Sequence, residues 1–287
     1  MKTAVALGTF DGVHAGHKAV LEAAVNSGHY SVAVAFRIPP KAYFLKEGVV
    51  LTREDSKTAL IKNIGIDSVD YLDFPDVKDI CAADFFDYIY ERYSPSLIVC
   101  GYNYSFGKGG VGNTALLKEL CDEKGIELKV IDKIAIDGQV ISSSFIRQLL
   151  KDGEISKAVS YLPDGFSVTG KVIHGDKRGR TICFPTVNQL YPDDLAPVKF
   201  GVYMTKTVID GKVYYGMTNI GLRPTFPSNI PLCETNLFDF KGDLYGKTVT
   251  LYLLSFIREE KKFSSLEELK SSIEADRKKI FDKIKNQ

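Results

Sequence analysis

The chain has 287 residues, an apolar fraction of 45% and a formal net charge of +1. This length allows one large or two ordinary domains, and the near-neutral charge provides no global field that would attract nucleic acid or an anionic membrane surface. Five cysteines without a CxxC pair suggest neither a disulfide framework nor a zinc site. The first residues do not resemble a signal peptide, and no segment approaches the ~20 apolar residues of a membrane span. We therefore expect a cytoplasmic protein with reduced cysteines.

The first half of the chain alternates short apolar strands with helices. Strands are predicted at residues 4–7, 30–36, 68–73, 97–100 and 127–132, and helices at 18–26, 52–63, 83–93 and 113–124. Strands separated by helices of this length are typical of an α/β doubly wound parallel sheet. Ligands of such sheets bind beyond the carboxyl ends of the strands, where the segments 8–17 and 101–112 are predicted to fall.

The pattern changes after two short predicted helices at 142–151 and 155–161. Strands are then predicted at residues 168–173, 202–209, 212–218 and 249–256, and Asp210-Gly211 is a strong hairpin signal. Ser265 and Glu268 form a predicted capping box for a last helix, in which apolar residues from Leu266 to Ile284 share one face. We expect an α/β domain at residues 1–158 and, at 159–287, a small antiparallel β-barrel with a C-terminal helix packed on it.

His14 and His17 stand three residues apart, with Gly16 between them, just after the first predicted strand. At a helix start both imidazoles can point toward one anion and donate hydrogen bonds to phosphate oxygens. Gly16 allows a nucleotide to approach the backbone closely. This is the HxGH pattern of class I nucleotidyltransferases. A helix cap or a surface pair is the alternative for two histidines at this spacing.

Three stretches of the first half resemble one known family. They are LGTFDGVHAGHKAVL at residues 7–21, GYNYSFG at 101–107 and ISSSFIR at 141–147. All three are similar to the FMN adenylyltransferase domain of the bacterial bifunctional riboflavin kinase/FAD synthetase family. In that family Asp is usual at the position of Asn103, and Thr at the position of Ser144.

The resemblance implies that an FMN phosphate oxygen attacks the α-phosphate of ATP and that pyrophosphate leaves, which gives FAD. His14 and His17 would be the catalytic pair on the phosphates, and Arg147 with the neighbouring serines would hold the β/γ end. The residues implied to bind ATP or FMN are Gly8, Phe10, Asp11, Gly12, Gly16, Asn103, Ser142, Ser143, Ser144 and Arg147. Asp11 would position the ribose or a hydrated metal, or else form the turn. Ser142–Ser144 can also be a simple helix cap.

The second half resembles the riboflavin kinase domain of the same family. The matching stretches are GKVIHGDKRGR at 170–180, FPTVN at 184–188, NIGLRPTF at 219–226, CETNLFDF at 233–240, DLYG at 243–246 and FIR at 256–258. Cys183 stands where Gly is usual in the family, and Val187 where Ala is usual. Both departures add side-chain bulk.

The second resemblance implies that Glu234 is the catalytic base, taking the proton from the ribityl hydroxyl that attacks the γ-phosphate of ATP. Thr186 and Asn188 would be neutral oxygen ligands of Mg²⁺. The residues implied to bind ATP or flavin are Gly170, Val172, Gly175, Lys177, Gly179, Arg180, Pro185 and Arg258. Arg258 can equally belong to a structural ion pair.

Together the two resemblances predict an enzyme that converts riboflavin to FMN and then FMN to FAD, with ATP as co-substrate and Mg²⁺ as cofactor. Riboflavin, FMN and ATP would be its partners, without nucleic acid or membrane, and the oligomeric state is left open. Two alternatives are a family member with one active site and a non-catalytic flavin-binding regulator. Retention of His14, His17, Thr186, Asn188 and Glu234 argues against both.

Overall fold

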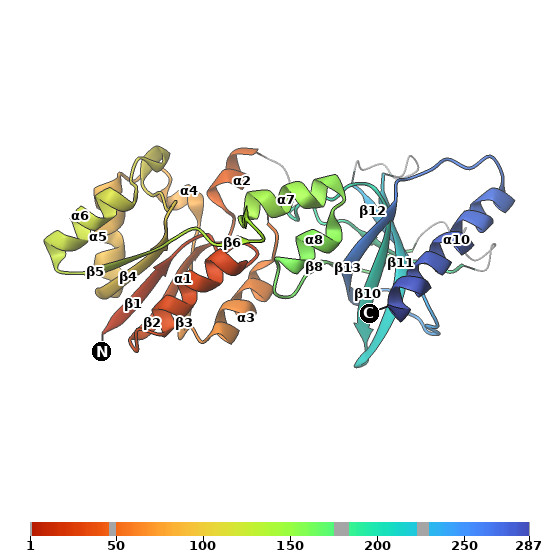
Figure 1. The fold of residues 1–287 in the computed structure, drawn as a ribbon, viewed down its shortest axis with the longest axis horizontal. Coiled ribbons are helices and arrows are strands. Elements are labelled where there is room, and N and C mark those ends of the chain that lie inside the picture. Colours follow the sequence, from red (N-terminus) through yellow and green to blue (C-terminus); the bar gives the residue numbers. More distant parts are fainter. Residues whose placement is uncertain (1, 46–49, 175–183, 223–229, 287) are drawn as a thin grey trace. The chain divides into compact units, whose positions relative to one another are not determined.

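The computed structural model describes residues 2–45, 50–174, 184–222 and 230–286 (Figure 1). The chain divides by its contacts into two compact units, which we describe separately. The first unit comprises Met1–Ile146 with Tyr161–Pro163, and the second comprises Arg147–Ser160 with Asp164–Gln287. The boundary between functional domains at residues 158 and 159 stays a prediction.

A five-stranded parallel sheet forms the centre of the first unit, as predicted. Its strands are β1 (Thr3–Leu7), β2 (Tyr30–Phe36), β3 (Ser68–Leu72), β4 (Pro95–Gly101) and β5 (Glu127–Ile131). The strand order is β3-β2-β1-β4-β5, so that β1 and β4 are neighbours although they are far apart in the sequence. The order of connection reverses between these two strands, and ligands of doubly wound sheets bind at such a switch point.

Four helices of 11 or 12 residues accompany the sheet: α1 (Ala15–Val25), α3 (Glu54–Ile64), α5 (Ala82–Tyr93) and α6 (Thr114–Lys124). The predicted start of α1 at Lys18 was wrong, because the residues Ala15-Gly16-His17 already form its first turn. The predicted start of the next helix at Thr52 was also wrong, because α3 begins at Glu54 and Arg53 holds its N-cap position. In this unit the prediction missed α2 (Pro40–Leu45), α4 (Phe74–Val77), the short 3₁₀ helix Lys108–Gly110, and the hairpin of β6 (Ala135–Ile136) and β7 (Gln139–Val140). In the second unit it missed the strands β9 (Val187–Leu190) and β12 (Leu232–Leu237).

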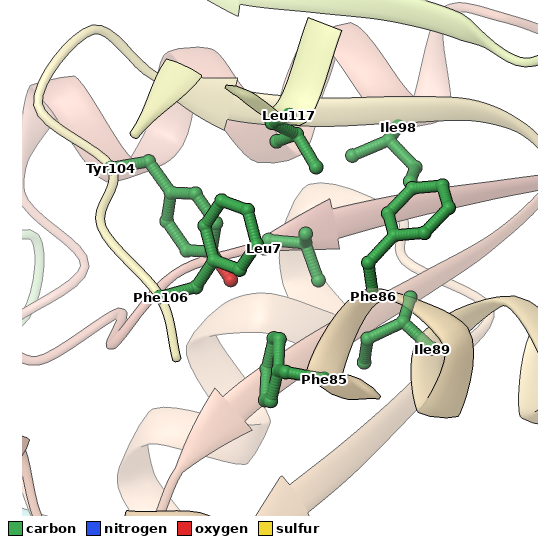
Figure 2. Close-up of a pocket in the computed structure, with 8 residues that line it drawn as sticks. All are labelled: Leu7, Phe85, Phe86, Ile89, Ile98, Tyr104, Phe106 and Leu117. Carbon is green, nitrogen blue, oxygen red and sulfur yellow. The ribbon is translucent and has the colours of Figure 1, made fainter. Parts of the chain in front are cut away.

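The two faces of the sheet carry different side chains because successive residues of a strand point to opposite sides. Val5 and Leu7 face α5 and α6, whereas Ala4 and Ala6 face α1 and α3. Figure 2 shows side chains of the first face closing around an apolar pocket, lined by Leu7, Phe85, Phe86, Ile89, Ile98, Tyr104, Phe106 and Leu117. Two of these rings come from the loop that follows β4. Their burial anchors that loop to the core.

Six antiparallel strands form the barrel of the second unit, in the order β8-β13-β10-β11-β12-β9. Their bounds are Phe166–Lys171 (β8), Val187–Leu190 (β9), Gly201–Ile209 (β10), Lys212–Gly221 (β11), Leu232–Leu237 (β12) and Thr248–Arg258 (β13). The Asp210-Gly211 hairpin is confirmed, since both residues adopt positive φ, 50° and 77°.

Side-chain bonds nearly close the barrel between its edge strands β8 and β9. The amide nitrogen Nε2 of Gln189 donates to the carbonyl oxygens of Gly170 at 2.7 Å and Val249 at 2.8 Å. Beside it, the backbone N–H of Ile173 donates to the carbonyl of Asn188 at 2.8 Å. These bonds fix the position of the segment that carries Asn188.

The described residues of the second half also contain three helices: α7 (Ser143–Asp152), α8 (Ile155–Ser160) and α10 (Leu266–Lys285). Ser265 caps α10 by accepting from the N–H of Glu268 at 3.1 Å. Ile280 of α10 is fully buried against Met204 and Phe238, which confirms that the helix packs on the barrel. Leu266 does not share this contact face, because it is 64% exposed.

A partly buried ion pair joins α10 to the end of β13. The Nε of Arg258 lies 2.7 Å from Oδ2 of Asp276, and the two side chains are 22% and 2% exposed. Removing Asp276 leaves the guanidinium of Arg258 without its carboxylate partner and only partly solvated. We expect Asp276→Ala to lower the free energy of unfolding by about 1–3 kcal/mol, measured by urea denaturation of the full chain. Glu274→Ala, at an exposed position of the same helix, is the control and should change it little.

Candidate functional site

A strained turn, residues 8–14, connects β1 to α1; we call it the phosphate turn. Phe10, Gly12 and Val13 have φ of 49°, 85° and 43°, although two of them are not glycine. The side chains of Phe10 and Val13 are fully buried, and this packing holds the strained backbone. A Cβ at Gly12 would lie 2.9 Å from a methyl carbon of Leu162.

The two histidines lie together at the N-terminus of α1. His14 is the N-cap residue, and its carbonyl accepts the first helical bond from the N–H of Lys18 at 2.9 Å. The imidazoles of His14 and His17 stack with centroids 3.8 Å apart and planes 20° apart. The ring of Phe10 packs edge-on against His17 at 5.5 Å. Two imidazoles at a helix N-terminus, where the dipole favours negative charge, form an arrangement suited to phosphate.

Asp11 is fully buried and holds the phosphate turn to its surroundings. Its Oδ1 accepts from the backbone N–H of Leu51 at 2.8 Å and of Thr52 at 3.3 Å. Its backbone carbonyl accepts from the hydroxyl of Ser143 at 2.9 Å. These bonds tie the turn to the segment before α3 and to the start of α7.

The serines at the start of α7 have separate local roles. The Oγ of Ser142 accepts from the N–H of Phe145 at 3.2 Å, which is a helix cap. Ser143 bonds to the phosphate turn, and Ser144 is exposed. Arg147 lies one helical turn after Ser143 but belongs by its contacts to the second unit.

The loop after β4 begins at the same edge of the sheet as the phosphate turn, because Leu7 of β1 pairs with Cys100 of β4. Asn103 of this loop is exposed. The rings of Tyr104 and Phe106 stack at 5.8 Å within the core. Gly107 has φ of 73°, and a Cβ there would lie 2.6 Å from Cα of Ala82, so glycine is required. The aromatic residues of this motif therefore anchor the loop, while Asn103 remains accessible.

Glu234 of β12 lies between two asparagines in the barrel. It pairs with Asn219 on β11 and with Asn188 on β9. Directly opposed residues of antiparallel strands share one face of the sheet, so the three polar side chains form one row. The neighbouring Thr235 points to the other side, where its hydroxyl bonds to that of Thr218 at 2.8 Å. Glu234 itself is half-buried.

The FPTVN segment is attached to the same strand. The side-chain amide of Asn236 donates to the carbonyl of Pro185 at 2.8 Å, which holds the segment against β12. Asn188 is 5% exposed, and its Oδ1 meets no hydrogen-bond donor among the residues that the structure describes. Thr186 is half-buried just before β9. A buried acceptor of this kind suits an oxygen ligand of a cation.

The other predicted kinase residues divide between described and undescribed parts of the chain. Gly170 and Val172 lie at the barrel seam, where the N–H of Val172 donates to the carbonyl of Lys247 at 2.9 Å. Val202 of β10 pairs with Asn219 on one side and with Arg258 on the other, so Arg258 lies in the same cross-strand row as Asn219. Arg258 also forms the ion pair with Asp276 described above. Four further residues lie outside the described ranges: Gly175, Lys177, Gly179 and Arg180. The same holds for Cys183.

Two residues near these sites were not predicted from the sequence. Asn219 is in the matched NIGLRPTF stretch, but its position beside Glu234 depends on the register of the strands and could not be seen in the motif. The Nδ2 of Asn219 donates to Oε1 of Glu260 at 3.0 Å. Lys57 is fully buried beside the phosphate turn, and burial lowers the pKa of its ammonium to about 8. The sequence does carry a signal for this burial. Lys57 lies three and four residues before Leu60 and Ile61, so the three side chains share the buried face of α3.

The described residues contain no group of three His, Cys, Asp or Glu side chains placed to hold a metal ion. Among the same residues, none of the helices combines the length and the apolar character needed to cross a membrane.

Comparison with known proteins gives a consistent result for both halves. The family model for FAD synthetase matches residues 1–145, and the model for riboflavin kinase matches residues 162–283. A bifunctional riboflavin kinase/FMN adenylyltransferase of Bacillus subtilis (strain 168) is 31% identical, over 99% of this chain and 93% of that protein. The protein of the same description from Escherichia coli (strain K12) is 33% identical, over 94% and 89%.

One solved structure is similar along almost the whole chain. It is described as a macrolide-efflux protein from Streptococcus pneumoniae, with a TM-score of 0.86 and 31% identity, over 96% of this chain and 92% of that one. Similarity of sequence over nearly the full length, with a matching model for each half, establishes the relationship. The chain belongs to the bifunctional riboflavin kinase/FMN adenylyltransferase family.

Proposed function

We propose that the first unit transfers an adenylyl group from ATP to FMN and that the second unit phosphorylates riboflavin. The observation that carries the proposal is the stacked pair His14 and His17 at the N-terminus of α1, beside the switch point of the sheet. The row Asn188, Glu234 and Asn219 supports the kinase activity independently. Membership of the family supports both activities rather than one.

Adenylyl transfer needs no covalent nucleophile on the protein. An oxygen of the FMN phosphate attacks the α-phosphorus of ATP in line, the bond to the β-phosphate breaks, and pyrophosphate leaves. His14 and His17 donate hydrogen bonds to phosphate oxygens as negative charge builds up on them. Asn103 and the hydroxyl of Ser144 are exposed and can bind nucleotide, whereas Asp11 and Ser143 hold the phosphate turn in place. Arg147 contributes positive charge toward the β/γ end of ATP.

Riboflavin phosphorylation needs a base and a phosphate-binding loop. Glu234 accepts the proton of the ribityl hydroxyl while that oxygen attacks the γ-phosphorus and ADP leaves. Asn188 and Thr186 fit Mg²⁺, on the evidence of the buried Oδ1 of Asn188, and the ion would neutralise phosphate charge when bound. The bond from the side chain of Asn236 to the carbonyl of Pro185 positions the segment that carries Thr186 and Asn188. The remaining predicted contacts, Gly170, Val172 and Arg258, are proposed to support the flavin and nucleotide sites.

The two activities are tested directly with the purified chain. Incubation of riboflavin with ATP and Mg²⁺ is expected to give FMN first and FAD afterwards. Chromatography of samples taken over time measures both products. FMN supplied in place of riboflavin should give FAD and pyrophosphate. Accumulation of FMN without FAD would exclude the adenylyltransferase activity. Failure to consume riboflavin while FMN is still converted would exclude the kinase activity.

A further inference from the structure

Lys57 on α3 is a buried cation for which neither proposed reaction has a role. Its side chain is fully buried, which is rare for lysine because burial of an isolated charge is unfavourable. The side chain lies at the carboxyl edge of the parallel sheet, where its Nζ donates to the carbonyl of Phe36 at 2.6 Å and reaches that of Arg37 at 3.5 Å. Phe36 is the last residue of β2. The ammonium therefore fixes the end of this strand.

The end of β2 is connected to the phosphate turn. The N–H of Gly8, the first residue of the turn, donates to the carbonyl of Val34 at 3.3 Å, two residues before Phe36. The carboxylate of Asp11 within the turn interacts electrostatically with Lys57 and favours its charged form. One ammonium thus acts on both the end of β2 and the phosphate turn that follows β1.

Among the residues that the structure describes, four charged or titratable groups face Lys57 from the elements packed around it. They are Asp11 from the phosphate turn, Arg37 after β2, Glu54 from α3 and Tyr71 from β3. Arg37 and Glu54 form an ion pair with one another, so their effects on Lys57 largely offset. The ring of Tyr71 lies 5.0 Å from Nζ, in cation–π range. Asp11 is left as the dominant buried counter-charge of Lys57.

We propose that Lys57 is a positioning residue for adenylyl transfer. Its ammonium holds the end of β2 and the phosphate turn in the arrangement that aligns His14 and His17. This inference rests on the proposed function of the first unit. Because Lys57 acts through the turn, its loss should disturb the two imidazoles and the adenylyl-transfer rate together.

Replacement of Lys57 by methionine tests the proposal, since methionine keeps the stem and removes the charge. We expect Lys57→Met to lower kcat for FAD formation by about 10²-fold, a loss typical of misplaced reacting groups, with riboflavin phosphorylation unchanged. Lys62→Met is the matched control, because Lys62 is an exposed lysine of the same helix. Lys57→Arg keeps the charge and should retain most of the activity near neutral pH.

A second readout does not depend on activity. Imidazole signals in ¹H–¹⁵N correlation spectra report the surroundings of the four histidines. Lys57→Met should shift the signals of His14 and His17 and leave those of His29 and His174 in place, whereas Lys62→Met should shift none. Unchanged signals and unchanged kcat in the folded Lys57→Met variant would overturn the proposal. A wild-type chain that makes no FAD would instead overturn the proposed function, and the spectra would still test Lys57.

The pH dependence adds a test that a purely structural role would not pass. The pKa of Lys57 is lowered to about 8, so wild-type adenylyl transfer should fall above this pH as the ammonium loses its proton. Stability changes in the opposite direction, because the unfolded chain keeps this proton to higher pH and folding is favoured as pH rises from about 8. The fall should be absent in Lys57→Arg, whose guanidinium stays charged. The same fall in Lys57→Arg would contradict the proposal.

Discussion

Glu234→Gln is expected to reduce riboflavin phosphorylation by about 10²- to 10⁴-fold, the usual contribution of a general base. Glutamine has nearly the same shape as glutamate but cannot accept the proton of the ribityl hydroxyl. The row with Asn188 and Asn219 is set by backbone register and should survive the change. The rate is measured as FMN formation from riboflavin and ATP. FAD formation from supplied FMN should remain at the wild-type rate, because His14 and His17 lie in the first unit.

Asp239→Asn is a matched control for this prediction. Asp239 is an exposed acid shortly after the same strand, and its φ of 58° is tolerated by asparagine. The control should phosphorylate riboflavin at the wild-type rate. Full kinase activity in Glu234→Gln would show that another group accepts the proton. Loss of both activities in the folded variant would contradict the assignment of the reactions to separate units.

His17→Ala is expected to reduce FAD formation from FMN by about 10²- to 10³-fold, in the range found when one donor to a developing anionic charge is removed. The substitution deletes an imidazole from the stacked pair and also removes the partner of the Phe10 ring. The fall should appear mainly in kcat, because the lost interaction strengthens as charge accumulates on the phosphates. The measurement is pyrophosphate release with FMN and ATP at saturating concentrations.

His29→Ala is the control for this second prediction, because His29 precedes β2 at the opposite, amino end of the sheet and contacts Ser96 there. Both FAD formation and riboflavin phosphorylation should be unaffected by it. For His17→Ala, riboflavin phosphorylation should also be unaffected. Undiminished FAD formation in His17→Ala would place phosphate binding elsewhere.

Local sequence patterns were sufficient for most of the fold. Apolar strands of four to seven residues separated by helices predicted the parallel sheet, and the Asp210-Gly211 pair predicted the β10–β11 hairpin. The start of α1 was missed because Gly16 and two histidines are typical of a turn. In the structure His14 takes the N-cap position with extended φ and ψ of −61° and 171°, and the helix begins directly after it. The helix therefore begins where the backbone leaves the extended conformation of His14, without a side-chain capping bond from this residue.

Non-local features of the sites were harder to predict. The motifs identified Glu234 and Asn188, but their pairing depends on which strands become neighbours, and this follows from the packing of the whole barrel. Lys57 was missed for a different reason. Lysine is normally exposed, and its burial became evident once the chain had brought Asp11 and the end of β2 around it. Asp11 itself was left between a ligand-binding role and a local Asx turn, and its bonds to the distant Leu51 and Thr52 are a long-range anchor that neither reading included.

Strand β9 carries two functions on adjacent residues, which face opposite sides of the sheet. Gln189 closes the barrel seam through its bonds to Gly170 and Val249, while Asn188 offers its buried oxygen to a ligand. A cation held by Asn188, as proposed above, would restrain the same short strand that links the barrel edges. Binding of that cation and closure of the barrel would then be thermodynamically linked through β9, so that occupancy of the site would stabilise the closed barrel and an opened seam would weaken the site.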